Sequence, residues 1–197
     1  MGKRATFDLL DAAIPTPDEY ERWQNYPDDA RFPAYRKHFL TDPVFWGRHQ
    51  PNDWAFELTW NEYRYADVAS PAEMDARIWS DEPGVYIFYV RPTRIVYRFP
   101  QFAFYIGISN ERGTNRPLRE RLKDYLPTQV AAKLKRDNID QMLQMYYGVL
   151  WVAYALAARP SYELLELEKK LHGFVYPCYS RRDFPDDIQT LRRRFQD

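Results

Sequence analysis

Glu168 is the residue whose place in the sequence most strongly suggests chemistry. Residues 160–175 predict an amphipathic helix, because at about 100° per residue its large apolar side chains cluster on one side. Glu168 falls inside this stripe, and a carboxylate that faces a core is costly unless it is paired or binds a cation. The sequence therefore favours either a cation-binding carboxylate or a partly buried ion pair with an arginine such as Arg121. The stripe consists of Leu164, Leu165, Leu167, Leu171 and Val175.

Two tyrosines are brought together by a predicted β-hairpin. Residues 84–90 and 102–107 are rich in β-branched and aromatic side chains, and the insert between them carries turn-forming prolines. This pattern is typical of two antiparallel strands. Tyr86 and Tyr105 would then lie on neighbouring strands. From these residues alone, both a functional pair of phenols and an aromatic-rich core hairpin remain open.

A second polar pair lies on a helix that we predict to begin at Pro117. Arg121 and Tyr125 are four residues apart, so they share a face of this helix. They lie beside an apolar stripe formed by Leu118, Leu122 and Leu126. Two short helices, over 127–134 and 139–147, and a buried strand over 148–158 are predicted to follow.

Composition excludes several classes of protein. The 197-residue chain is 45% apolar and 17% aromatic, which is enough to fill a core. The single cysteine, Cys178, excludes an intrachain disulfide framework and a cysteine-only zinc cluster, and the three histidines have no ligand-like spacing. The longest apolar run is about half of what a membrane span needs. We therefore expect a soluble protein located in the cytoplasm.

The net charge of zero hides an uneven distribution. Residues 1–83 contain 9 Lys and Arg against 16 Asp and Glu, a charge of −7, and residues 84–197 contain the other 19 against 12, a charge of +7. Such an asymmetry indicates a part that faces a polyanion and a separate acidic part.

Residues 1–81 are predicted to form an acidic N-terminal extension that packs on the main domain. Alternating apolar residues over 54–60 predict a half-buried strand, followed by a turn at Asn61-Glu62. A basic tail with a short helix is expected over 181–197. Short helices are predicted in the extension at 17–24, 30–40 and 71–79. In the first and the last of these, Pro17 and Pro71 suit the first turn and follow Thr16 and Ser70 as caps.

Taken together, these elements resemble the GIY-YIG endonuclease domain, in the version found in the bacterial excision-repair incision enzyme. The resemblance covers residues 82–180 and implies an α/β (α+β) fold, a small three-stranded antiparallel sheet flanked by helices. The implied strands are 84–90, about 102–108 and about 148–157. The matching elements are Gly84-Val85-Tyr86, Tyr105-Ile106-Gly107, Arg121 with Tyr125, and Glu168 with Pro177 and Tyr179.

The resemblance implies metal-dependent hydrolysis of DNA phosphodiester bonds. Tyr86 and Tyr105 would contact the attacking water and the scissile phosphate, one of them, for which we favour Tyr86, as general base. Arg121 would stabilise charge on the phosphate, Glu168 would hold one Mg²⁺ or Mn²⁺, and Tyr125 would support them. Gly107 and Ser180 belong to the implied substrate site. Candidate phosphate contacts are Arg112, Arg116, Arg119, Lys123, Lys133, Lys135 and Arg136.

The sequence also departs from the family pattern. Ser180 stands where the family has Asn, Ile108 stands where the repair enzyme has Lys, and the insert between the two tyrosines is longer than usual. An alternative is therefore a catalytically inactive GIY-YIG-fold protein that binds nucleic acid or a protein partner. In a third interpretation, the acidic extension covers the basic face as an autoinhibitor or DNA mimic. We expect DNA as a partner, no membrane, and a homodimer or protein partner bound through the extension.

Overall fold

The computed structural model describes residues 48–90, 102–111, 113, 115–127, 137–177 and 184–190. The predicted helices at 17–24 and 30–40, most of the predicted helix at 127–134, and the insert between the tyrosine strands lie outside these residues. So do Arg112, Lys133, Lys135, Arg136 and Ser180.

The centre of the fold is an antiparallel sheet in the order β1-β4-β2-β3. Its strands are β1 (Asn61–Arg64), β2 (Gly84–Val90), β3 (Phe102–Ile108) and β4 (Leu150–Leu156). The three expected strands are present, but the expected number of strands was wrong. The fourth strand is β1, which pairs with β4 from Asn61 opposite Tyr154 to Arg64 opposite Trp151.

The predicted hairpin is confirmed, and its register places the tyrosines. Tyr86 of β2 lies opposite Gly107 of β3, and Phe88 lies opposite Tyr105, before an irregularity that follows Phe88. Because side chains alternate between the faces of a sheet, Tyr86 and Phe88 point to one face and Val85 and Ile87 to the other. Tyr86 and Tyr105 therefore lie on adjacent strands, as expected.

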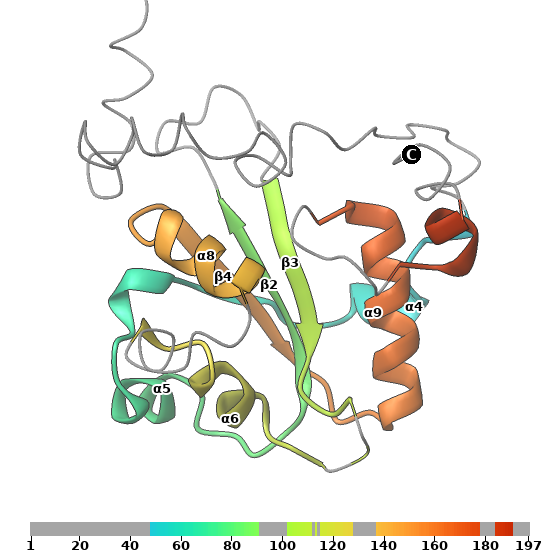
Figure 1. Cartoon of the computed structure of the whole chain (residues 1–197). Coiled ribbons are helices and arrows are strands. Elements are labelled where there is room, and N and C mark those ends of the chain that lie inside the picture. The colour runs from blue at the N-terminus through green and yellow to red at the C-terminus, as the bar shows by residue number, and fades with distance from the viewer. Residues whose placement is uncertain are drawn as a thin grey trace, which may run out of the picture.

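Helices cover both faces of the sheet (Figure 1). On one face lie α5 (Pro71–Arg77), α6 (Leu118–Lys123) and α8 (Asp137–Met145), together with the short 3-10 helix η1 (Tyr65–Asp67). On the other lie α4 (Asp53–Phe56) and α9 (Ser161–Val175). The first core contains Tyr86, Phe88, Tyr105, Leu118, Leu122 and Tyr125, and the second contains Val85, Ile106, Ile108, Leu164, Leu167 and Leu171.

The helices begin where the sequence indicates. The side chain of Ser70 accepts a hydrogen bond from the backbone of Glu73, whose carboxylate accepts one in return, and Pro71 occupies the first turn of α5. Pro117 and Pro160 directly precede α6 and α9. Helix α9 ends at Tyr176, whose left-handed φ of 53° stops it before Pro177. Residues 186–190 are also helical.

Two local predictions in the N-terminal part were wrong. The segment around Trp54 is the short helix α4, in which Ala55 is buried while Phe56 is 69% exposed. The expected turn at Asn61-Glu62 is the start of β1. Residues 54–60 do alternate, but the packing of Ala55 on the second core accompanies a helix there, and pairing with β4 makes Asn61 and Glu62 part of a strand.

Candidate active site

Tyr86 is the centre of a buried polar cluster. Its side chain is 0% exposed, and its hydroxyl group shares a hydrogen bond of 2.8 Å with the hydroxyl group of Tyr125. The same Tyr86 oxygen accepts a hydrogen bond of 3.2 Å from Nε of Arg121. Strand β2 and helix α6 with the turn that follows it thus hold the three side chains together.

Gly107 makes room for this hydroxyl group. A Cβ atom at position 107 would lie 2.4 Å from Oη of Tyr86 and 2.6 Å from its Cζ, far inside contact distance. The cross-strand pairing of Tyr86 with Gly107 therefore explains why this strand tolerates a glycine. Gly107 was expected at the substrate site, and the structure places it against Tyr86.

The Arg121 guanidinium group joins the cluster to a loop carboxylate. Its Nη2 donates a hydrogen bond of 2.6 Å to Oε1 of Glu111, and its Cζ lies 5.5 Å from the centroid of the Tyr125 ring. The Arg121 side chain is 9% exposed and that of Glu111 is 40% exposed. Sequence reasoning missed Glu111, because nothing distinguishes its residue type and loop position from those of an ordinary solvated charge.

Glu168 and Tyr105 lie next to this cluster. Glu168 is 7% exposed in α9, which confirms that the helix buries it. Helix α9 packs on β3, the strand that carries Tyr105. The Tyr105 ring centroid lies 6.1 Å from that of Tyr86 and 6.3 Å from that of Tyr125. Five predicted site residues, Tyr86, Tyr105, Arg121, Tyr125 and Glu168, therefore gather around β2 and β3.

Burial keeps the two motif tyrosines protonated. Desolvation, followed by the neighbouring phenols, holds the pKa of Tyr86 well above its usual range, and the charge of Arg121 only partly offsets this effect. Burial, Tyr125 and the negative charge of Glu168 raise the pKa of Tyr105 in the same way. In this arrangement both side chains are hydrogen-bonding phenols.

The donor set around Glu168 limits which metal it could hold. Within the described parts of the chain, no three or more His, Cys, Asp or Glu side chains are grouped to hold a metal ion. A preformed zinc or calcium cage of such ligands is therefore not found there. One buried carboxylate fits Mg²⁺, which keeps several of its waters and takes further ligands from a substrate phosphate.

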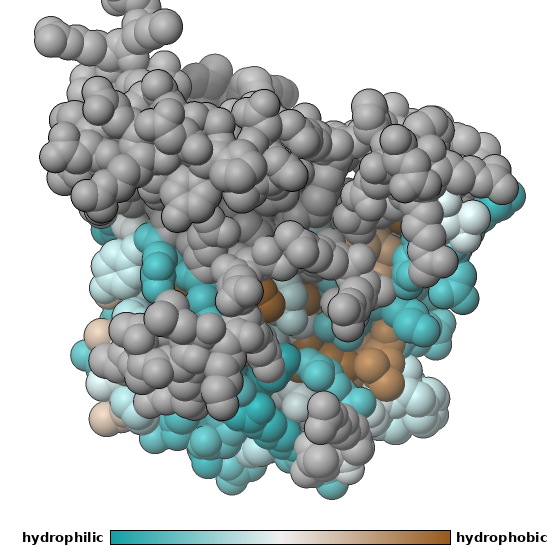
Figure 2. Space-filling model, viewed as in Figure 1, coloured by the Kyte–Doolittle hydropathy of each residue, from teal (hydrophilic) through white to brown (hydrophobic). Residues whose placement is uncertain are grey.

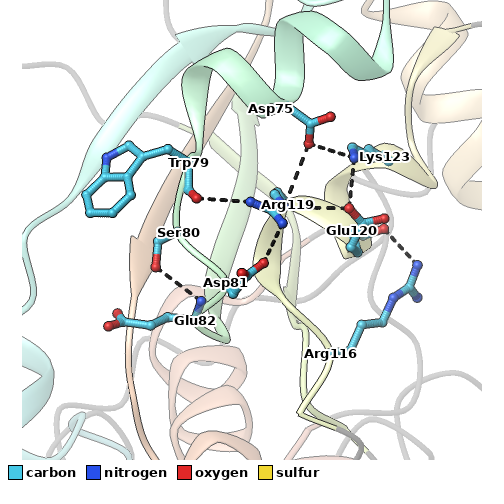
Figure 3. A network of polar contacts seen from close by, with 9 residues as sticks. All are labelled: Asp75, Trp79, Ser80, Asp81, Glu82, Arg116, Arg119, Glu120 and Lys123. Carbon is cyan, nitrogen blue, oxygen red and sulfur yellow. Dashed lines mark hydrogen bonds and ion pairs between the residues drawn. The ribbon is translucent and has the colours of Figure 1, made fainter.

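Of the basic residues expected to contact phosphates, the three that the structure describes, Arg116, Arg119 and Lys123, are already paired with acidic side chains on or near α6 (Figure 3). Arg119 forms ion pairs with Asp81 and, at 3.7 Å, with Asp75, and it also donates a hydrogen bond of 2.9 Å to the backbone oxygen of Trp79. Lys123 lies 2.6 Å from the carboxylate of Asp75.

The remaining pairs come from α6 itself and its end. Lys123 lies 2.8 Å from Glu120, and Arg116 lies 2.9 Å from Asp124. Figure 2 shows that the visible surface next to α6 is largely hydrophilic, while apolar side chains reach the surface beside β3 and α9. A nucleic acid that approached this side of α6 would compete with acidic side chains for Arg116, Arg119 and Lys123.

Comparisons of the chain with models of protein families, with curated proteins and with solved structures found no match. The resemblance to the GIY-YIG domain therefore stays a prediction from the sequence. Among the described residues, no helix has the length and apolar character needed to cross a membrane.

Proposed function

We propose that the protein is a metal-dependent endonuclease that hydrolyses DNA phosphodiester bonds at the cluster of Tyr86, Tyr105, Arg121, Tyr125 and Glu168. The observation that carries the proposal is the direct contact of Arg121 with Tyr86, together with the buried carboxylate of Glu168, which acts electrostatically on the neighbouring Tyr105. A buried guanidinium group and a buried carboxylate near two phenols are the groups that phosphodiester hydrolysis requires. The guanidinium group neutralises the phosphate, and the carboxylate can hold a cation.

Each side chain has a role in this proposal. Arg121 would donate two hydrogen bonds to the phosphate as negative charge builds up on its oxygen atoms. The hydroxyl group of Tyr86, which is itself hydrogen-bonded to that of Tyr125, holds the guanidinium group and would orient the attacking water, and Tyr105 would contact the phosphate from β3. Glu168 would hold one Mg²⁺ or Mn²⁺. When bound, this ion would neutralise charge on the phosphate and lower the pKa of nearby water and phenol groups.

Plasmid cleavage tests the proposal. Wild type is expected to nick supercoiled plasmid in Mg²⁺ or Mn²⁺ and not in EDTA. Glu168→Gln and Tyr86→Phe should each lower the rate by about 100-fold or more, as losses of catalytic groups commonly do. The matched control is Glu166→Gln on the same helix, where Glu166 is exposed and pairs with Lys170 at 3.0 Å. Full cleavage by folded Glu168→Gln and by folded Tyr86→Phe would exclude this cluster as the site of cleavage.

A second candidate is a nucleic-acid-binding or interaction protein without catalysis. The observation in its favour is that each of the five site residues as a whole is at most 8% exposed, while Tyr86 and Tyr105 are held as phenols. This candidate predicts DNA binding that weakens with salt and no cleavage with any divalent metal. Fluorescence anisotropy with a labelled duplex, measured beside the plasmid assay, separates the two functions.

A further inference from the structure

Glu111 occupies one side of the arginine on which the proposed chemistry depends. Among the described residues, the Arg121 guanidinium group has three hydrogen-bonding or ion-pairing partners, in addition to its contact with the Tyr125 ring. Its Nε donates to Tyr86 at 3.2 Å, its Nη1 lies 3.7 Å from Asp124, and its Nη2 donates to Glu111 at 2.6 Å. The shortest of these contacts is the one to Glu111.

Of these partners, Glu111 is the one that a ligand from solvent would replace. Tyr86 is fully buried, and Asp124 makes a closer contact with Arg116, at 2.9 Å, than with Arg121. The Glu111 side chain is 40% exposed. A carboxylate and a phosphate present similar pairs of oxygens to a guanidinium fork. Glu111 therefore holds Arg121 in the way that a phosphate would.

The residue before Glu111 is held in place, so we expect the Glu111 side chain to leave without moving Asn110. Asn110 is 2% exposed, and its backbone oxygen accepts a hydrogen bond of 2.6 Å from Oγ of Ser161 in α9. The Asn110 side chain also accepts one of 2.9 Å from the backbone of Asn115. Rotation of an exposed side chain is fast compared with binding.

We propose that Glu111 is a built-in competitor of the substrate phosphate at Arg121. The proposal rests on the proposed function, because it takes a nucleic-acid phosphate as the ligand of Arg121. While Glu111 is bound, its carboxylate neutralises the positive charge of Arg121 and accepts a hydrogen bond from Nη2. A phosphate of the nucleic acid must displace this carboxylate, so the ion pair lowers affinity and excludes weakly bound anions.

The test is DNA binding in EDTA, which needs no cleavage. Anisotropy of a short fluorescein-labelled duplex at low salt should show that Glu111→Gln binds about fivefold more tightly than wild type, the change expected from releasing one partly exposed ion pair. The matched control is Glu163→Gln, which removes a carboxylate from an ion pair of 3.7 Å with Arg159. This control should bind as wild type does.

A double-mutant cycle separates the role of Glu111 from general charge repulsion. In Arg121→Gln, whose folding is checked by circular dichroism, adding Glu111→Gln should give no further gain in affinity, because no guanidinium group is left to release. The proposal would be overturned if Glu111→Gln bound DNA as wild type does or more weakly, or if its gain in affinity were equal to that of Glu163→Gln. It would also be overturned if neither wild type nor Glu111→Gln bound DNA. Tighter binding by Glu111→Gln without plasmid cleavage by wild type would contradict only the nuclease.

Discussion

At the scale of single residues, Gly107 has the clearest physical role in the site. A strand loses stability when it contains a glycine, because the residue gives up more backbone entropy and packs no side chain. Here the missing side chain of Gly107 leaves space for the Tyr86 hydroxyl group, which contacts both Arg121 and Tyr125. The glycine thus sets the geometry of a polar cluster to which it contributes no polar side-chain atom.

Gly107→Ala should therefore disturb the site and the fold together. The added Cβ atom would meet Oη of Tyr86 at 2.4 Å, so the ring must shift and its hydrogen bonds must lengthen. We expect a loss of about 1–3 kcal/mol in the free energy of unfolding, as for overpacked cores, together with loss of plasmid cleavage. Urea denaturation and the plasmid assay measure the two effects.

Gly113→Ala is the control for this variant. Gly113 has a φ of 67° and no atom within 4 Å of an added Cβ, so alanine there brings backbone strain of about 1–2 kcal/mol and no clash. If the two variants lost the same stability and both kept full cleavage, Gly107 would have no special part in the site.

The residues of the candidate site were predictable to different degrees. Strand and helix patterns combined with motif spacing predicted five of them, because regular elements fix where their side chains point. These five are Tyr86, Tyr105, Arg121, Tyr125 and Glu168. Glu111 could not be found in this way. Its contact with Arg121 depends on the path of the loop after β3, which residue types do not specify.

At the scale of elements, helix α6 contacts α5 and the segment between α5 and β2. At this contact, acidic residues of the N-terminal part of the chain meet basic residues of the C-terminal part. Asp75 lies in α5 and Asp81 in the segment that leads to β2, and both pair with Arg119 (Figure 3). The charge asymmetry seen in the sequence thus has a local counterpart in the fold. These pairs support the interpretation in which acidic residues cover cations on α6.

Replacing both acidic residues should expose the cations of α6. Because Asp75 and Asp81 are largely exposed, Asp75→Asn with Asp81→Asn should change the free energy of unfolding by less than about 1 kcal/mol. The same variant should bind duplex DNA more tightly, and the gain should disappear at high salt. Anisotropy titrations at two salt concentrations measure the gain in DNA affinity and its loss at high salt.

The control makes the same change of charge on the other face of the sheet. Asp53→Asn with Glu57→Gln, in α4 and at its C-cap, removes two negative charges away from α6. An equal gain in DNA affinity from both double variants would show that total charge, and not the contact with α6, controls binding.

Most elements with strong local signals were predicted correctly, although the alternation over 54–60 wrongly predicted a strand. Strand β1, which depends on a distant partner, was missed. The leucine stripes and the prolines before α6 and α9 predict these helices, and the density of β-branched and aromatic residues predicts β2, β3 and β4. Strand β1 has weak local signals, because Asn61 and Glu62 are typical of turns. It exists because β4 offers a free edge on which it pairs.

At the scale of the whole molecule, the extension and the main domain share one sheet. Strand β1 comes from the first 81 residues and pairs with β4, whose other neighbour is β2. Tyr63 of β1 packs in the same core as Tyr86. Deleting residues 1–80 would remove this strand and expose the edge of β4, so point variants are the better way to test the role of the acidic segment.

Buried tyrosines make the stability of the fold sensitive to alkaline pH. Burial raises the pKa of Tyr63, Tyr65, Tyr86 and Tyr105 above the ordinary value of 10.0. Above about pH 10 the unfolded chain loses phenolic protons that the folded chain keeps, so stability is full below this pH and falls as the pH rises. The slope is about 1.4 kcal/mol per pH unit for each such tyrosine.

Urea denaturation from about pH 9 to about pH 11 measures this slope. Tyr86→Phe should reduce it by the contribution of one tyrosine, whereas Tyr162→Phe, at a side chain that is 68% exposed, should leave it as in wild type. A flat profile for wild type would contradict the prediction.

The position of β4 in the sheet also has a consequence for synthesis on the ribosome. This strand lies between β1 and β2 but is made last of the four, after residue 149. The nascent chain can form the β2–β3 hairpin early, but β1 has no strand to pair with until most of the chain has left the exit tunnel. The complete sheet can therefore assemble only after β4 has been translated. The rate of this assembly is governed by contacts between residues that are distant in the sequence.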